Sequence, residues 1–339
     1  MANRIFYAVQ QVSIDKDGDG VGYQAVRGVQ SVSMTTTFNL EQAFELGQLE
    51  IYENIEGVPS VEMTINRLLD GSALAYVLAA GGTGVNYAGD INKASQNVFN
   101  VRLGIWDEAS NSSAGSNPAS NQVTISGAVL NSVSYTFGAD GNFTEEISLS
   151  ANNKAWFSGT CANAAWADDL TAGAFGSNDD APNFIGGVQR REYFDKPNCT
   201  VPSLIPEGKN RLQSISVSAD FGREDLFELG QKGPFAKVAT FPLEVTCSIE
   251  VLSSGGDLVN ATVDGCGDIA CTDGINNLTN ETIIISLCDG TVIDLGQRNK
   301  LSSVSYGGGD AGGGNVTQTY DFVTYNKLSV SGTGSLVGD

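Results

Sequence analysis

The sequence predicts a mainly β protein built as two tandem β-sandwich or β-barrel domains, each with at most one short flanking helix. Three observations indicate this fold class. Two stretches of the 339-residue chain repeat each other, several segments alternate apolar and polar residues as half-buried strands do, and many of the 41 glycines gather in turn-like clusters. The glycine-rich stretch over residues 307–314, which also contains Asp310 and Ala311, is one such cluster.

The first repeat matches residues 30–59 with residues 213–242. Every matched residue is offset by 183 positions, and the match includes an identical FELGQ pentapeptide in each stretch. Because the same offset holds over the whole stretch without a gap, chance is a poor explanation. Such internal self-similarity indicates duplicated structural units.

A second repeat follows the first in each half. Residues 130–135 match residues 301–306 at an offset of 171, which makes the second copy 12 residues shorter between the two repeats. Further matches at an offset of 173 join residues 141–154 to residues 314–327. We interpret the chain as a tandem duplication, and its parts are a first copy over 1–155, a linker over 156–183, and a second copy over 184–339.

Composition excludes several functions. The chain carries a net charge of −21 with 18 Lys and Arg, so attraction to nucleic acid through phosphate neutralisation is not expected. It has no histidine, which removes the usual general base and the commonest metal ligand. The adjacent carboxylates Glu145 and Glu146 would point to opposite faces of a strand, so they are poor acid–base partners. We expect no enzyme activity and no cofactor.

The first six residues lack the long apolar segment of a secretory signal, and the longest apolar run, near 73–80, is far shorter than a membrane span. All six cysteines follow residue 160, whereas a disulfide framework would place them in both copies. We therefore expect free, buried thiols in a reducing compartment. The Cys266 and Cys271 pair has no companion at zinc-ribbon spacing, so it is a weak metal candidate.

Residues 4–14 are predicted as the first strand. The acidic segment that follows places Asp15, Asp17 and Asp19 at positions 1, 3 and 5 of a calcium loop, with a glycine at position 6. The twelfth position, where a bidentate Glu belongs, is Val26. An acidic hairpin turn without a metal is the favoured interpretation.

A strand is predicted over 25–38, and a long connection containing FELGQ over 39–57. The strand over 58–68 alternates cleanly, so one face should be buried and the other wet. Ser72 is a suitable N-cap for a short helix, whose i, i+3, i+4 stripe would pack on the sheet. The residues of the buried face are Val61, Met63 and Ile65, and those of the helical stripe are Leu74, Val77 and Leu78.

The remaining predicted elements complete two similar sets. A strand over 96–106 and a loop over 107–120 precede a hairpin of strands 123–137 and 143–149. Between 253 and 280 no helical stripe is obvious. The strands expected in the second copy lie near 211–221, 242–252, 281–295, 300–306 and 316–330.

This order of elements resembles the tail tube proteins of long-tailed bacteriophages. The segments that carry the resemblance are 30–71 with 123–154, and again 213–250 with 301–327, so it covers most of both halves. The resemblance implies tail-tube-type domains that form rings, and rings that stack into a hollow tube through which genomic DNA passes without specific binding. Its implied partners are further copies of the chain and other tail proteins. The implied location is the virion tail, after assembly in the host cytoplasm.

Composition alone would equally allow a secreted carbohydrate-binding β-sandwich module or a surface-layer protein, neither of which explains the missing signal segment well. Another tail or baseplate structural protein is a further alternative. Each FELGQ segment is expected to anchor the local core, to lie in the loop that reaches the neighbouring ring, or to do both. An acidic inner wall would repel DNA, and Glu62 and Glu244 are candidates for it. The FELGQ residues are Phe44, Glu45, Leu46, Gly47 and Gln48 in the first copy, and Phe227, Glu228, Leu229, Gly230 and Gln231 in the second.

Ring size follows from the resemblance as well. Single-domain relatives close a ring with six domains, so a chain that supplies two equivalent domains would close it with three copies. The competing arrangement has six chains, with the second domain on the outside of the tube.

Overall fold

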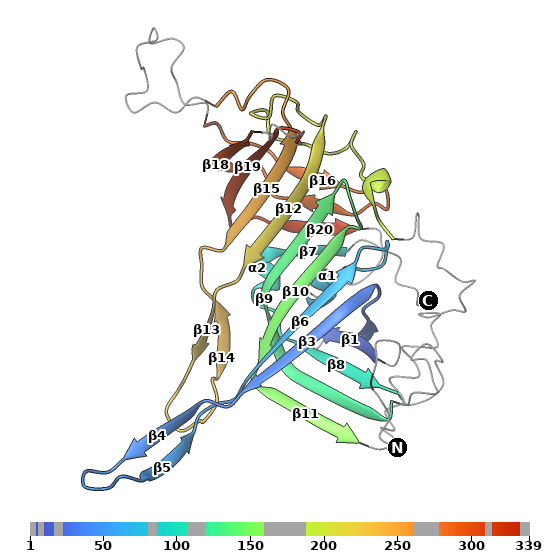
Figure 1. Cartoon of the computed structure of the whole chain (residues 1–339). Coiled ribbons are helices and arrows are strands. Elements are labelled where there is room, and N and C mark those ends of the chain that lie inside the picture. Colours follow the sequence, from blue (N-terminus) through green and yellow to red (C-terminus); the bar gives the residue numbers. More distant parts are fainter. Residues whose placement is uncertain are drawn as a thin grey trace.

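The computed structural model describes residue 5 and residues 10–16, 23–80, 87–106, 119–158, 188–259, 278–308 and 314–332. Its largest sheet contains a path of eight antiparallel strands in the order β18-β19-β15-β12-β9-β10-β6-β3 (Figure 1). The strands of this path are β3 (Val29–Thr37), β6 (Ser60–Leu68), β9 (Asn121–Gly138), β10 (Thr144–Ala151), β12 (Leu212–Asp220), β15 (Glu244–Leu252), β18 (Lys300–Gly307) and β19 (Thr317–Tyr325). The mainly β prediction is confirmed.

The path consists of two runs of four strands that meet in the middle. The run β3-β6-β10-β9 comes from the first half of the chain and the run β12-β15-β19-β18 from the second. They join by antiparallel pairing of β9 with β12, in which Ser134 lies opposite Ser218 and Ser132 opposite Asp220. The two halves therefore share one continuous sheet. The predicted linker falls largely outside the described residues.

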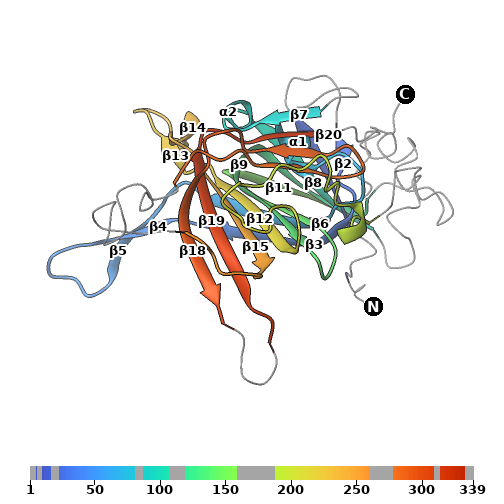
Figure 2. The ribbon, with the colours of Figure 1, turned by 90° about the horizontal axis from the view of Figure 1, so that it is seen from above.

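A second layer covers one face of this sheet. One part is formed by β1 and β8, with the N-terminal half of the long β9, and another is the four-stranded sheet β16-β17-β20-β7. Figures 1 and 2 show these strands and both helices on the same side of the eight-strand path. Their bounds are β1 (Gln10–Lys16), β2 (Gln24–Ala25), β7 (Tyr87–Asp90), β8 (Phe99–Ile105), β11 (Asn153–Ser158), β16 (Ile284–Ser286), β17 (Val292–Asp294), β20 (Ser329–Gly332), α1 (Ala75–Ala80), α2 (Ile91–Ala94) and the 3-10 turn η3 (Arg191–Tyr193).

The core lies between the layers. The predicted inward residues of β6, Val61, Met63 and Ile65, are all buried, and in the second half Val245 and Ile249 are buried in the same way on β15. The hairpin of β9 and β10 also forms as predicted. One continuous apolar core therefore runs under both halves of the sheet.

Two hairpins leave the sheet at the same end (Figure 1). The first arm, residues 39–57, contains β4 (Leu40–Phe44) and β5 (Ile51–Glu56), and the second arm, residues 222–240, contains β13 (Arg223–Leu226) and β14 (Ala236–Ala239). The sequence predicted only a long connection at 39–57. Neither hairpin carries a buried apolar face, which is the signal that sequence patterning detects.

Helix α1 begins at Ala75, and the prediction that Ser72 caps it is wrong. The N–H groups of Ala75 and Tyr76 instead donate to the two carboxylate oxygens of Glu145, at 2.9 and 3.0 Å. The Oγ of Ser72 accepts a hydrogen bond from Arg67 at 2.8 Å. The cap comes from a strand 70 residues away in sequence, so local patterning could not reveal it.

The single strand expected over 281–295 is also wrong. The segment forms two short strands, β16 and β17, joined by a tight turn. Gly290 has φ of 89° in that turn, and the Leu287 N–H donates to the Thr291 carbonyl at 2.8 Å. The described part of the first predicted strand is β1, which continues to Lys16, two residues past the predicted end; residues 4 and 6–9 of that prediction lie outside the described residues.

Candidate assembly interface

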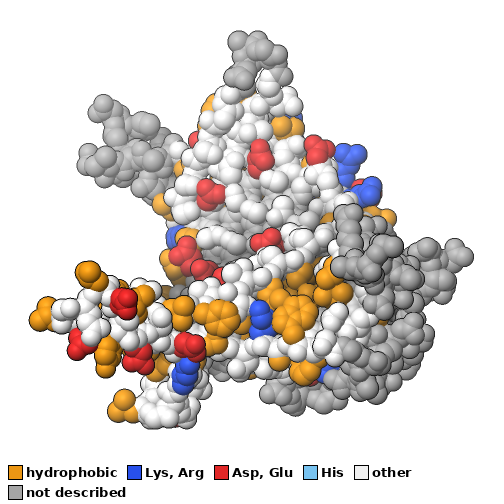
Figure 3. All heavy atoms as spheres, turned by 60° about the horizontal axis from the view of Figure 1, so that its bottom comes forward, with side chains coloured by type: hydrophobic (Ala, Val, Ile, Leu, Met, Phe, Trp, Pro, Cys, Tyr) orange, Lys and Arg blue, Asp and Glu red, His pale blue; other side chains and the backbone are white. Residues whose placement is uncertain are grey.

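The first arm exposes an unusual amount of apolar surface. Phe44 is 66% exposed, Leu46 103% and Leu49 104%. The expectation that Phe44 and Leu46 anchor the local core is therefore wrong for this chain, and the same holds for Phe227 and Leu229 in the second arm. Exposed apolar side chains gathered on a projecting element indicate a partner surface. Figure 3 shows them on the projecting hairpin, interspersed with acidic side chains.

Both FELGQ segments form the same turn. Gly47 and Gly230 adopt φ of 93° and 96°, a backbone conformation that is strained for any residue with a side chain. In the first arm the amide of Gln48 donates to the carboxylate of Glu45 at 3.0 Å, and in the second arm Gln231 donates to Glu228 in the same way. The pentapeptide therefore encodes a tip geometry in which the apolar residues point outward.

The two arms differ in charge. The first arm contains five glutamates and no Lys or Arg, whereas the second contains three acidic and three basic residues. They also differ in their attachment. Arg223 of the second arm donates from Nε to the Leu130 carbonyl at 2.6 Å and from Nη1 to the Ser95 carbonyl at 2.5 Å. Burial lowers the pKa of Arg223 to about 10. The second arm is thus tied to the first half of the chain.

The uncovered face of the eight-strand path is polar and acidic. Cross-strand register places the predicted wall residues Glu62 and Glu244 on this same face, and both are exposed. Of the two cationic residues of these eight strands, Arg67 is buried. Lys300 is exposed and lies opposite Val323, which its register places on the acidic face, and its Nζ donates to the Leu278 carbonyl at 2.6 Å. Over this sheet Figure 3 shows scattered acidic side chains. The carboxylates on the face are Glu62, Glu146, Asp220, Glu244, Glu250 and Asp321.

The eight-strand path ends in two open edges. Strand β3 pairs with β6 on one side, and β18 pairs with β19 on one side; neither has a second strand partner among the described residues. An open edge presents a row of unpaired backbone donors and acceptors, which recruits another strand unless it is blocked. Neither β3 nor β18 contains proline, and β3 carries no charged residue.

A buried charge network fixes the first half internally. Arg67 lies 2.9 Å from Asp70 and 3.7 Å from Glu145, and the side chains of Arg67 and Glu145 are fully buried. The Tyr135 hydroxyl donates to Glu145 at 3.1 Å. Burial, followed by the charge of Glu145, raises the pKa of Tyr135 well above its ordinary value. Both carboxylate oxygens of Glu145 accept hydrogen bonds from the first turn of α1, so the network positions this helix.

The calcium-loop candidate is only partly described. Asp15 belongs to β1, and Asp17 and Asp19 lie outside the described residues. Among the described residues no group of three metal-ligating side chains is assembled. Cys199 and Cys247 are free and buried, as expected, and Cys288 is free but exposed; the other three cysteines are outside the described residues. No helix of the described part is long and apolar enough to cross a membrane.

Sequence reasoning missed two features of this interface. The second arm repeats the FELGQ signal, yet its attachment through Arg223 depends on carbonyls of residues far away in sequence. The β9–β12 pairing was equally invisible, although the repeated Ser-x-Ser patterns of the two strands mark both as polar on one face.

No protein-family model matches the chain, and no curated protein matches it. Solved structures similar to it include one in the baseplate of the anti-feeding prophage, with a TM-score of 0.32, 13% identity, and coverage of 47% of this chain and 98% of that chain. A chain of the sheath–tube complex of an extracellular contractile injection system has a TM-score of 0.32 and 14% identity, covering 46% and 92%. Hcp1 from Flavobacterium johnsoniae has a TM-score of 0.24 and 14% identity, covering 44% and 96%.

Proposed function

We propose that this chain is a structural virion protein of a phage tail, and that its copies pair edge to edge into rings that stack into a hollow tube. The two halves, residues 1–155 and 184–339, act as duplicated tail-tube-type domains, so three chains complete a ring with approximate sixfold symmetry. The tube conducts genomic DNA without binding it specifically. Other tail proteins contact its ends, assembly takes place in the host cytoplasm, and the chain performs no catalysis.

One observation carries this proposal: the pairing of β9 with β12 inside the chain. By the repeat offsets of 171 and 183 residues, β9 corresponds to β18 and β12 to β3. The two open edges are therefore equivalent to the two strands already joined within the chain. A contact that joins the halves can be repeated between chains until the rotation closes.

The internal pairing also specifies the register between chains. Ser134 lies opposite Ser218 within the chain, and the offsets convert this pair to Ser305 opposite Thr35 of the next chain. The strands are antiparallel, as in the internal junction. Each chain then satisfies the open edge of its neighbour on both sides, which removes the aggregation hazard of free edges.

Three copies of the eight-strand path would close a barrel of 24 strands. Strands about 4.8 Å apart and tilted by about 40° give a circumference of about 150 Å and a backbone diameter of roughly 50 Å. The second layer adds bulk to one face only, so the uncovered face lies inside. This is a conduit wide enough for a DNA duplex.

The inner wall would then be the acidic face that contains Glu62 and Glu244. DNA carries one negative charge per about 1.7 Å of its axis, so a wall whose carboxylates outnumber its one exposed lysine, Lys300, gives it little counterion-release binding. Repulsion keeps the duplex away from the wall and lets it slide. Lysines introduced at both positions should retard DNA passage.

The arms supply contact between rings. Both leave the same end of the sheet and present apolar tips, so they reach toward the next ring. Chains that lack residues 39–57 or 222–240 should fold and form rings but fail to elongate into rods.

The ring is tested with the cysteine pair Thr35→Cys and Ser305→Cys. Opposite residues of an antiparallel pair have Cα atoms about 4.5–5.5 Å apart, within the range that a disulfide bridges. Under mild oxidation we expect covalent dimers and trimers on non-reducing gels and no larger species. The mass per unit length of the rods should correspond to three chains of 35.4 kDa per ring.

The matched control is Ser31→Cys with Ser305→Cys, which is four residues out of register and should not crosslink. Each single cysteine variant controls for the native thiols. A ladder that continues to six chains supports six-membered rings and refutes the trimer, and equal crosslinking of the control pair refutes the register.

A further inference from the structure

A cavity with a cationic and aromatic lining lies where the two halves of the chain meet. It has a volume of about 190 Å³. Phe137, Phe143 and Phe194 form one side: the rings of Phe137 and Phe143 are 5.2 Å apart, and those of Phe143 and Phe194 are 6.5 Å apart, both edge to face. These rings give the cavity an apolar wall.

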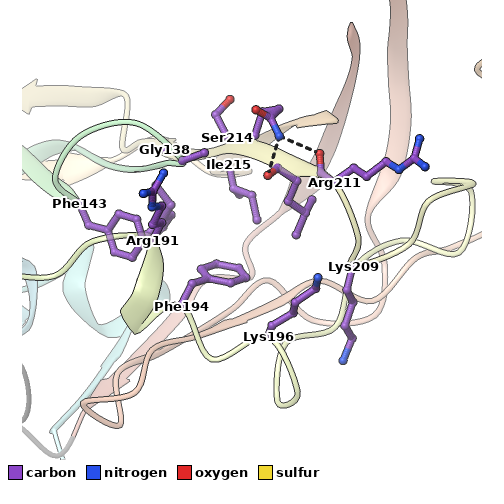
Figure 4. A pocket seen from close by; sticks show the side chains of 13 residues that line it. Gly138, Phe143, Arg191, Phe194, Lys196, Lys209, Arg211, Ser214 and Ile215 are labelled. Carbon is purple, nitrogen blue, oxygen red and sulfur yellow. Dashed lines mark hydrogen bonds between the residues drawn. The ribbon is translucent and has the colours of Figure 1, made fainter. Parts of the chain in front are cut away.

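Cations surround this apolar wall. Arg191, Lys196, Lys209 and Arg211 line the cavity, and no Asp or Glu of the described part of the chain does. Figure 4 shows Arg191 beside Phe143, with Lys196 and Lys209 on the other side of Phe194. Four of the 18 cationic residues of a chain with net charge −21 therefore meet at one cavity. None of the four forms an ion pair with another described residue. We call this site the basic pocket.

The basic pocket and the arms lie at opposite ends of the sheet. The pocket is at the start of β12, where Leu212 and Ile215 line it, whereas the second arm begins after the end of β12 at Asp220. Strand β3 runs parallel to β12 across the intervening antiparallel strands, so the first arm leaves the same end as the second. A strand of nine residues separates the two ends by roughly 30 Å. In stacked rings, the arms of one ring face the pockets of the next.

We propose that the tip of the first arm docks in the basic pocket of a chain in the adjacent ring. Leu46 and the neighbouring apolar side chains fill the cavity against the phenylalanines, while Glu45 and Glu50 face Arg191 and Lys196. This inference rests on the proposed function, because it needs stacked rings. It assigns to the first arm a receptor that the sequence did not suggest.

Charge selects the first arm over the second. The first arm has a net charge of −5 and the second arm a net charge of zero, with Lys232 immediately after the FELGQ tip. Complementary charge across an interface fixes its register and disfavours wrong partners. The cationic pocket therefore discriminates between two tips of identical turn geometry.

The numbers of arms and pockets also agree. The repeat offsets convert Phe137, Phe143 and Arg211 to Gly308, Val316 and Gly28, so the junction between chains lacks the aromatic and cationic lining. A ring of three chains thus has three basic pockets and three acidic arms. The one-to-one match sets the rotation of one ring on the next.

A charge-reversal experiment tests the docking. Because Arg191 and Lys196 are exposed, replacing them does not disturb the core. The pocket variant Arg191→Glu with Lys196→Glu, and the arm variant Glu45→Lys with Glu50→Lys, should each raise the critical concentration for rod formation about tenfold. The combined variant restores the charge pairing and should return to within about threefold of the parent. Sedimentation and negative-stain microscopy measure the rods.

The matched control is Glu228→Lys at the tip of the second arm. Any rise in the critical concentration for rod formation that this variant causes should not be relieved by adding the pocket variant. In every variant the Thr35→Cys and Ser305→Cys crosslink reports ring formation separately. The docking is overturned, and the proposed function left intact, if rings form but the combined variant assembles rods as poorly as the pocket variant or the arm variant alone. Single variants that stack normally overturn it too, and absence of crosslinked rings in the parent refutes the proposed function itself.

Discussion

Replacing Glu145 with glutamine should destabilise the first half of the chain strongly. The carboxylate of Glu145 has no solvent-exposed side-chain surface, accepts the N–H groups of Ala75 and Tyr76 and the Tyr135 hydroxyl, and lies 3.7 Å from Arg67. In the Glu145→Gln variant one carboxylate oxygen becomes an NH2 donor, which faces other donors in either orientation of the amide. The change also removes a negative charge beside a buried guanidinium.

The magnitude follows from these contacts. Removing one partner of a buried ion pair costs about 3–5 kcal/mol, and a hydrogen bond to a charged group contributes about 1.5–3 kcal/mol. Arg67 keeps Asp70 at 2.9 Å, which limits the loss. We expect the free energy of unfolding to fall by about 3 kcal/mol. The assay is urea unfolding of unassembled protein followed by circular dichroism.

Glu146→Gln is the matched control for this prediction. Glu146 is the next residue of β10, but its side chain is exposed and accepts one hydrogen bond, from Asn66 at 3.2 Å. Its replacement should change the free energy of unfolding by less than about 0.5 kcal/mol. Equal losses in the two variants would refute the assignment of Glu145 as the buried cap of α1.

Two further predictions concern the second half. Burial and, less strongly, Asp321 raise the pKa of Cys247 to about 12 from an ordinary value of 9.0, so the unfolded chain loses this proton first as pH rises. The contribution of the protonated Cys247 thiol to the unfolding free energy is complete below pH 9 and is lost between pH 9 and 12, by up to about 1.4 kcal/mol per pH unit. Cys247→Val should therefore flatten the pH dependence of the unfolding free energy. An equal flattening by Cys288→Val, at an exposed thiol, would contradict this. Arg223→Met leaves the Leu130 and Ser95 carbonyls without their donor, so the second arm should open and be cleaved several-fold faster by protease. Lys232→Met at the exposed tip should leave the rate of cleavage unchanged. Equal cleavage rates in the two variants would argue against Arg223 as the attachment of the second arm.

Much of the main sheet was predictable from the sequence. The alternation of Val61, Met63 and Ile65 marked β6 and its buried face, because the two-residue period of a strand is a local property. The same reasoning located β9, β10, β12 and β15. It also placed Glu145 and Glu146 on opposite faces. The FELGQ tips were singled out because they repeat.

Features that depend on contacts between distant residues were not predictable. The cap of α1 comes from Glu145 and not from Ser72, the second arm is held by carbonyls at Ser95 and Leu130, and the basic pocket joins residues from three separate segments. Nothing in the local sequence of these residues records their partners.

The sequence by itself determined that the chain is mainly β, where most strands lie, that its wet faces are acidic, and that two stretches repeat. Only the tertiary structure decided that the two halves share one sheet through β9 and β12, that both arms leave one end, and that the basic pocket lies at the other. The physical reason is that side-chain periodicity is written into neighbouring residues. Strand order and edge pairing depend on which backbone donors and acceptors meet after the chain folds.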